Sequence, residues 1–340
     1  MGSPTLGRPT APGAVAGPRI ERDVVLQFQG DWGQANLHRI CGWLAQEFND
    51  RAGPGSRTAT WSGRGGSDAV EHVAEGQVDL AMITPAYLGH SARHGLGMFD
   101  GKPHPELRAL GALPQDDRLV LAIAAELDIC SFADLRALKP PLRIATSHDD
   151  GVNTIGYAVT RVLAAHRTSR DAIAGWGGQF LEAERPFPPI EWYREGAADA
   201  VFHEAIMSPE WQRATTERET RFVQMEQEAL ALLDVELGWP SGVLPAGYLP
   251  GLDVDLLTLD FSDFLVLVHE DMPDDVAYLL TWCMNETGEA IERQYRHIPA
   301  DRSPVGYPLD SRRIQRTPIP LHPAAERYYN ELAHSEEAET

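Results

Sequence analysis

Short polar loops follow several apolar stretches of this chain, and their side chains are candidates for contacts with a ligand. The first loop, GDWGQAN at residues 30–36, comes after the apolar stretch 24–28. Directly after it, apolar residues recur at helical spacing at Leu37, Ile40, Cys41, Leu44 and Phe48. This order predicts a strand, a loop and a helix. Free amide groups and the positive end of the helix dipole gather at such a junction, where ligands of open α/β sheets bind.

Four later loops have the same character. They read SGRGGSD at 62–68, TPAY at 84–87, SHDDG at 147–151 and HE at 203–204, and each follows a predicted strand. If all five loops face one cleft, we expect its ligand-binding residues to be Asp31, Trp32, Gln34, Asn36, Ser62, Arg64, Ser67, Thr84, Tyr87, Thr146, Ser147, His148, Asp149, His203 and Glu204.

The loops combine groups that suit an anion with groups that repel one. Hydroxyls, amides at helix ends and a bidentate Arg64 would suit a carboxylate, although Arg64 has an alternative as a solvated loop arginine. Asp31, Asp149, Asp150 and Glu204 would repel an anion unless they point outward or, as for Asp149 or Asp150, cap a helix. An amino-acid-like ligand would satisfy both sets of groups.

Histidines beside carboxylates raise two further alternatives, a metal site and acid–base catalysis. His148-Asp149 and His203-Glu204 have suitable groups for either if their loops converge. His90 and His94 are spaced to share a helix face, but the sequence HSARH lacks the glutamate of an HExxH motif and a third ligand. GxSxG, GxGxxG and phosphate-loop motifs do not occur. We therefore predict no metal, no cofactor and no catalytic residue.

The composition is that of a globular protein with an acidic surface. The chain has 340 residues, of which 43% are hydrophobic, and a formal net charge of −21. The hydrophobic fraction excludes wholesale disorder, and the negative charge argues against nucleic acid and anionic lipid as partners. The three cysteines are far apart, so no disulfide framework is predicted. No stretch approaches the roughly 18 apolar residues of a membrane span.

Strands that alternate with helices predict βαβ units in a largely parallel sheet. The predicted strands are 24–28, 57–61, 78–83, 107–113, 118–124, 142–146, 199–202, 254–259 and 264–268. Besides the first helix, the predicted helices are 69–74 with Ser67 or Asp68 as its cap, 152–163, 225–233, 274–284 and 324–332. We expect a flexible tail at 1–21, a first lobe at 22–113, a second lobe at 114–254, and at 255–340 a return to the first lobe with C-terminal helices.

Five stretches, taken together and in order, resemble the TAXI family, the solute receptors of TRAP transporters. They read LRALGALPQDDRLVLAI, ICSFADLRAL, LPAGYLPG, DMPDDVAYLLTWCM and TPIPLHPAAERYY. The resemblance implies an α/β fold of two lobes, the type II-like periplasmic-binding-protein fold, with a ligand cleft between the lobes. It also implies an organic anion or amino acid as ligand, TRAP membrane subunits as partner and an extracytoplasmic location. The chain departs from the family pattern in three ligand loops, at 31–36, 147–150 and 203–204.

We therefore expect a monomeric, non-catalytic receptor that closes on a small carboxylate-bearing solute, an organic acid or amino acid. Closure would bend the chain near residues 113–120 and 255–264. The alternative is an intracellular enzyme or ligand sensor on the same scaffold, which uses His148, Asp149, His203 and Glu204. Its motivation is that residues 1–19 lack the apolar core of a secretion signal. Either a leader was removed or Met1 starts a cytoplasmic protein.

Overall fold

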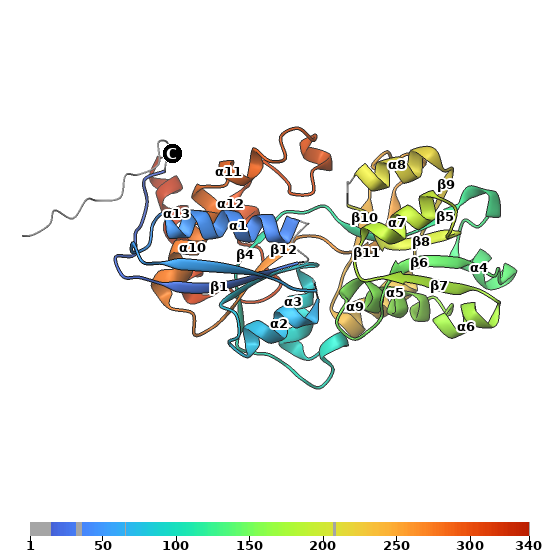
Figure 1. Ribbon diagram of the computed structural model, residues 1–340, viewed down its shortest axis with the longest axis horizontal. Helices are drawn as coiled ribbons and strands as arrows, with labels where there is room; N and C mark the ends of the chain where they lie inside the picture. The colour runs from blue at the N-terminus through green and yellow to red at the C-terminus, as the bar shows by residue number, and fades with distance from the viewer. Residues whose placement is uncertain (1–14, 32–35, 65, 207–208, 340) are drawn as a thin grey trace, which may run out of the picture.

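The computed structural model describes residues 15–31, 36–64, 66–206 and 209–339, and these form two lobes (Figure 1). Each lobe is built on its own mixed sheet. The chain crosses between the lobes at residues 114–117 and 261–263. The two crossing segments are tied together, because the Gln115 N–H donates to Asp263 Oδ1 over 3.0 Å and the Asp263 N–H donates to the Gln115 carbonyl over 3.1 Å.

The first lobe has a five-stranded sheet in the order β2-β1-β3-β12-β4. β1 pairs in parallel with β2 and β3, whereas β12 is antiparallel to β3 and β4. Its strands are β1 (Val25–Gly30), β2 (Arg57–Ser62), β3 (Leu80–Ile83), β4 (Leu107–Leu113) and β12 (Phe264–His269). Its helices are α1 (Asn36–Asn49), α2 (Ser67–Ala74), α3 (Tyr87–His94), η1 (Gly97–Phe99), α10 (Asp274–Glu286), α11 (Glu289–Glu292), η3 (Ala300–Arg302), α12 (Ser311–Ile314) and α13 (Pro323–Glu339).

The second lobe has a sheet in the order β10-β11-β5-β8-β6-β7, and β9 also pairs with β5. β6 is parallel to β7 and β8, and the other pairs are antiparallel. Its strands are β5 (Arg118–Ala124), β6 (Arg143–Ser147), β7 (Gln179–Ala183), β8 (Ala200–Glu204), β9 (Thr220–Val223), β10 (Ser241–Leu244) and β11 (Leu256–Asp260). Its helices are η2 (Ala125–Leu127), α4 (Phe132–Leu138), α5 (Thr154–Ala165), α6 (Arg170–Gly175), α7 (Phe187–Arg194), α8 (Pro209–Glu217) and α9 (Gln227–Leu237).

Apolar faces of the helices bury both sides of each sheet. In the first lobe α1, α10 and α13 cover one face and α2 and α3 the other (Figure 1). In the second lobe α4, α5 and α9 cover one face and α7 and α8 the other. The four residues of β3, Leu-Ala-Met-Ile, are all buried because this strand is covered on both faces. The sheets are therefore rigid supports for the loops at their strand ends.

The lobes also contact each other away from the crossing segments. The indole Nε1 of Trp239 donates to Ser91 Oγ over 2.8 Å, and both residues are buried. Ser91 belongs to α3 of the first lobe, and its hydroxyl also bonds to the carbonyl of Leu237 at the end of α9. This contact links α3 and α9 on one side of the molecule.

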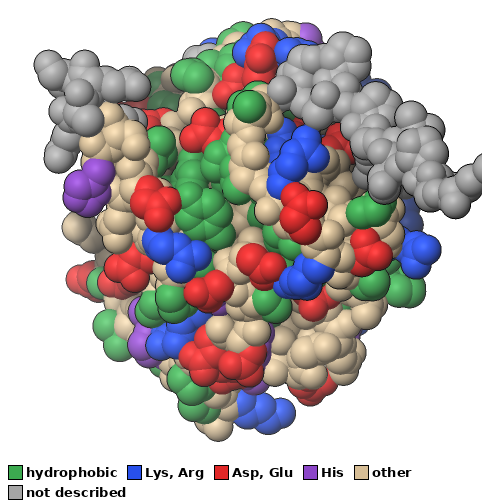
Figure 2. Space-filling view, turned by 90° about the vertical axis from the view of Figure 1, so that its left-hand side faces the viewer, with side chains coloured by type: hydrophobic (Ala, Val, Ile, Leu, Met, Phe, Trp, Pro, Cys, Tyr) green, Lys and Arg blue, Asp and Glu red, His purple; other side chains and the backbone are tan. Residues whose placement is uncertain are grey.

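Charges of both signs are interspersed on the outer end of the first lobe (Figure 2). Arg22 pairs with Asp275 at 2.8 Å and Arg327 with Asp274 at 3.4 Å. The net charge of −21 therefore does not appear on this face as one acidic field.

Three expectations about the elements need correction. The sheets are mixed, because β5 and β12, which follow the two crossings, both run antiparallel to their neighbours. The sequence places the return to the first lobe at residue 255, but β11 still pairs with β5 of the second lobe. The N-cap of α2 is Gly66, and the Asp68 carboxylate instead accepts the N–H groups of Arg64 and Gly66.

Phe28 and Val25 on the same strand provide a test of this packing. Phe28 is fully buried under α1, whereas Val25 is 68% exposed. We expect Phe28→Ala to lower the free energy of unfolding by about 3–5 kcal/mol, because it leaves a cavity in the core. Val25→Ala, the control, should change it by less than about 0.5 kcal/mol. Urea unfolding followed by circular dichroism measures both, and equal effects would contradict the assignment of strand faces.

Candidate functional site

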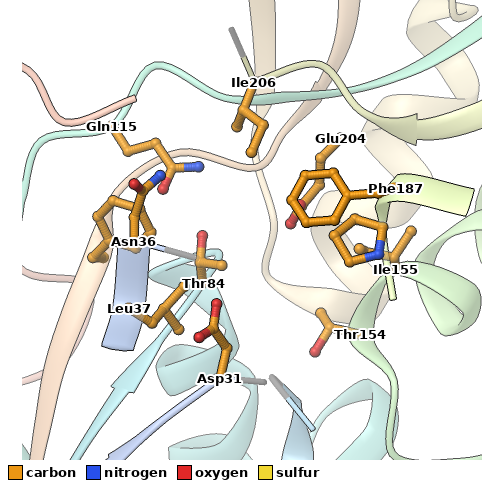
Figure 3. Close-up of a pocket in the computed structure, with 12 residues that line it drawn as sticks. Asp31, Asn36, Leu37, Thr84, Gln115, Thr154, Ile155, Phe187, Glu204 and Ile206 are labelled. Atoms are coloured by element: carbon orange, nitrogen blue, oxygen red, sulfur yellow. The ribbon is translucent and has the colours of Figure 1, made fainter. Parts of the chain in front are cut away.

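A cavity lies between the lobes, at the carboxyl ends of several strands (Figure 3). The first lobe and the crossings contribute Asp31, Asn36, Leu37, Thr84, Gln115 and Phe264, and the second lobe contributes Thr154, Ile155, Pro186, Phe187, Glu204 and Ile206. The space enclosed, its open mouth included, is about 550 Å³. The end of β1 and the start of α5 thus meet at the same cavity from opposite lobes, whereas none of the residues 147–151 is among its described lining.

The ionisable side chains among these described lining residues are all acidic. Asp31 directly follows β1 and Glu204 ends β8, so the two carboxylates enter the cavity from different lobes (Figure 3). None of the described lining residues is Lys, Arg or His. Asp31 is 1% exposed, so its charge is poorly screened by water.

Burial and the charge of Asp31 raise the pKa of Glu204 from 4.5 to about 7. Burial and the nearby Glu204 likewise raise the pKa of Asp117, which lies beneath the cavity in the first crossing. Within the described part of the chain, no group donates a hydrogen bond to the Glu204 carboxylate, whose lone pairs face the cavity. The empty cavity is therefore an unfavourable place for the ionised form of Glu204.

Two buried polar side chains of the lining lack a hydrogen-bond partner for one oxygen among the described residues. Gln115 is 2% exposed, and its Nε2 donates to Asp117 Oδ2 over 3.1 Å, which leaves its Oε1 without a partner. Thr154 is also 2% exposed, and its Oγ1 has no partner. Buried polar atoms rarely stay unpaired, so each marks a place where a ligand or a water can bind.

The helices α1 and α5 both begin at the cavity. α5 is capped by Asn153, whose Oδ1 accepts the N–H groups of Ile155 and Gly156 over 3.0 and 3.2 Å. α1 begins at Asn36, whose side-chain oxygen accepts the hydroxyl of Tyr295 over 2.6 Å. The first amides of α5 are thus already satisfied by the protein.

The second predicted loop forms the rim rather than the lining. Arg64 Nε donates to Glu184 Oε1 over 3.0 Å, and its terminal nitrogen bonds to Asp150, both in the other lobe. The N–H of Ser67 donates to the Val152 carbonyl over 3.1 Å, and its hydroxyl donates to the Gly151 carbonyl over 3.2 Å. These contacts join the lobes, so Arg64 binds protein carboxylates here, and Ser62 lies exposed beside them.

His203 is buried below the site and not in it. Its Nδ1 accepts the N–H of Glu204 over 2.9 Å, so its Nε2 carries the proton and donates to Ser147 Oγ over 3.2 Å. Burial lowers the pKa of His203 to about 3, which keeps the ring neutral. Thr146 is also buried, and its hydroxyl donates to the Phe202 carbonyl over 2.9 Å. Thr146, Ser147 and His203 therefore brace β6 against β8.

The remaining predicted residues lie around the cavity or outside the described chain. His148 has a half-exposed side chain with Glu182 at 4.0 Å, and Asp149 is exposed. Tyr87 is half-buried and packs on the core beside the cavity. Trp32 and Gln34 are outside the described residues. Within the described chain, no group of three His, Cys, Asp or Glu side chains is placed to hold a metal ion.

Of the expected ligand-binding residues, Asp31, Asn36, Thr84 and Glu204 line the cavity. Sequence reasoning missed the other lining residues, among them Gln115, Thr154 and Phe187. Gln115 comes two residues after the predicted strand 107–113, in the segment PQDD between the two lobes, and a polar residue at that crossing was a usable signal. Phe187, in the sequence RPFPP, gave no sign that it would face a cavity.

Comparison with known proteins decides the family. The model of the NMT1-like family matches residues 46–332. The chain belongs to the NMT1-like family. No curated protein sequence matches this NMT1-like chain.

Solved structures confirm the predicted fold of the NMT1-like chain. The protein PhnD1 of Prochlorococcus marinus, solved in complex with methylphosphonate, superposes with a TM-score of 0.52 at 12% identity, over 91% of this chain and 98% of that one. A protein of Bordetella bronchiseptica RB50 superposes with a TM-score of 0.51 at 10% identity, over 92% and 98% of the two chains. The NMT1-like chain thus has the two-lobed periplasmic-binding-protein fold. In its described residues, no helix is both long and apolar enough to span a bilayer.

The raised pKa of Glu204 makes a prediction about stability. Between pH 4.5 and 7 the folded protein holds a proton on Glu204 that the unfolded chain releases, so the wild type loses stability as the pH rises. We expect Glu204→Gln to remove this loss and to be the more stable protein above pH 7. The gain in the free energy of unfolding is at most about 3 kcal/mol, since a pKa shift of one unit corresponds to about 1.4 kcal/mol. Thermal unfolding across this pH range measures it.

The control for this experiment is Glu228→Gln, at an exposed position of α9. Its stability should follow that of the wild type at every pH. If Glu204→Gln also follows the wild type, the Glu204 carboxyl is not in the environment described.

Proposed function

We propose that this NMT1-like chain is a non-catalytic receptor that captures a small solute by closing its two lobes. The observation that carries the proposal is the cavity, which is lined from both lobes at the carboxyl ends of β1, β3 and β8 and at the start of α5. Ligands of open α/β sheets bind at such ends. The family and the likeness to PhnD1, solved with methylphosphonate, support the same function.

The ordered motifs that resemble the TAXI family support a partner and a location for this receptor. We propose that it works as a monomer outside the cytoplasm, in the periplasm or at the cell surface, and delivers its solute to TRAP membrane subunits. Genes for such subunits beside the gene of this chain would support the proposal, and genes of an ABC transporter in that place would contradict its TRAP part.

The resemblance further supports a carboxylate-bearing solute, an organic acid or an amino acid. The cavity contains the hydroxyl of Thr154 and the start of α1 at Asn36, both suited to a carboxylate. The alternative of an enzyme or sensor gains no support from His203, because both of its ring nitrogens are engaged inside the protein. Acid–base catalysis needs a ring nitrogen that can reach a substrate.

The proposal predicts that a bound solute brings the lobes together and is released unchanged. A panel of organic acids and amino acids is screened by thermal shift, and each hit is examined by small-angle X-ray scattering. We expect at least one compound to raise the melting temperature and to reduce the radius of gyration. If the free protein is already closed, the compound should instead narrow the distribution of interatomic distances derived from the scattering. No hit in the panel, or a hit that mass spectrometry shows to be converted, would contradict the proposal.

The rim contacts predict how the ligand-free protein behaves. Arg64→Gln removes the ion pairs with Asp150 and Glu184, which join the lobes across the cavity mouth. These pairs are largely exposed and are worth up to about 1 kcal/mol each. We therefore expect the ligand-free variant to show a larger radius of gyration than the wild type at low salt.

The difference should shrink between about 0.05 M and about 0.5 M sodium chloride, because salt screens exposed pairs. Arg221→Gln, at an exposed position of β9, is the matched control and should leave the scattering unchanged. Identical curves for Arg64→Gln and the wild type at low salt would show that the rim pairs do not set the lobe separation.

A further inference from the structure

We propose that the solute bound in this cavity carries an ammonium group, which is held between the carboxylates of Asp31 and Glu204 and the amide oxygen of Gln115. This inference rests on the proposed function and specifies the chemistry of the same site. It replaces a purely anionic solute by an organic cation or a zwitterion, such as an amine or an amino acid.

The first support is the charge of the cavity. Asp31 and Glu204 enter it from opposite lobes, and no described lining residue is basic. The charge of Asp31 acts on Glu204 strongly enough to raise its pKa together with burial. An anion placed beside them would meet like charges in a poorly screened space, whereas a cation there would favour the ionised form of both.

The second support is independent of charge and comes from the hydrogen-bond inventory. Gln115 is buried, one N–H of its Nε2 donates to Asp117, and its Oε1 is an acceptor without a partner among the described residues. The Glu204 carboxylate likewise offers acceptors for which the described chain supplies no donor. An ammonium group has several N–H donors and no acceptor, and it therefore matches these atoms.

The other lining residues indicate what the part of the solute beyond its ammonium group is like. Leu37, Ile155, Pro186, Phe187, Ile206 and Phe264 make about half of the wall apolar. A bare inorganic cation would leave these side chains without contacts, whereas an aliphatic or aromatic group would bury against them. The site therefore fits an ammonium group attached to an apolar body.

This arrangement also couples binding to closure. The two carboxylates approach each other when the lobes close, because each belongs to a different lobe. Their repulsion opposes closure of the empty cleft, and an ammonium group between them turns it into attraction. A solute that carries this group thus shifts the protein to its closed form, and a solute that lacks it does not.

The experiment compares solutes that differ only in their charged groups. L-leucine, 3-methylbutylamine and 4-methylpentanoate share one apolar body and are a zwitterion, a cation and an anion, respectively. L-phenylalanine, 2-phenylethylamine and 3-phenylpropionate form a second set. Isothermal titration calorimetry on the whole chain measures each dissociation constant, and X-ray scattering measures closure. We expect the amino acid or the amine of at least one set to bind at least about tenfold more tightly than its acid.

Two outcomes separate the failure of this inference from the failure of the proposed function. If an acid binds and closes the protein as well as its amino-containing partners do, the ammonium inference is wrong and the receptor function stands. If no member of either set, and none of the organic acids and amino acids of the wider panel, binds or closes the protein, both proposals fail.

Variants test the residues named. Glu204→Gln and Asp31→Asn keep the shape of each side chain and remove its charge, and each should weaken binding of the amino-containing solute by about tenfold or more. Binding of the matched acid should be unchanged or tighter, a result that a general loss of structure would not give. Glu228→Gln is the control. If both charge-removing variants bind the amino-containing solute as tightly as the wild type, the assignment of its ammonium group to these carboxylates is overturned.

Discussion

The constraint on which this structure depends is the placement of two carboxylates in one cavity between the lobes. Asp31 and Glu204 come from the ends of strands in different lobes, and burial together with the charge of Asp31 opposes the ionised state of Glu204. Folded proteins rarely contain such energetically unfavourable charged groups, and where they do, the groups usually serve a function. Here the cost is largest when both groups are charged and no cation lies between them, so a bound cation would lower it.

The scaffold holds these groups in place without help from the ligand. β1 and β8 are interior strands of their sheets, so the positions of Asp31 and Glu204 follow from the packing of each lobe. His203 and Thr146 fix β8 to β6 through bonds to Ser147 and Phe202. The histidine that the sequence offers as a catalyst is instead a neutral brace beneath the site.

The separation of the lobes is governed by contacts of two kinds. Buried contacts, such as that of Trp239 with Ser91, involve little water and little charge. The rim contacts of Arg64 with Asp150 and Glu184 are exposed and salt-sensitive. Gln115 connects the cavity to the crossing segments. Its backbone ties the two crossings together, and its side chain faces the cavity. A ligand that binds Gln115 therefore acts directly on a crossing segment.

The sequence by itself determined most of the strands, the helix after the first loop and the presence of polar residues at strand ends, because these follow from local periodicity. Of the residues that it proposed for the site, Asp31, Asn36, Thr84 and Glu204 line the cavity. Only the tertiary structure decided which of two residues adjacent in the sequence faces the cavity. His203 and Glu204 are adjacent, yet one is buried in the second lobe and the other faces the cavity, because successive side chains of a strand point to opposite sides. The roles of Gln115, Phe187 and Arg64 likewise depend on how the lobes meet, and no local pattern of residues encodes that contact.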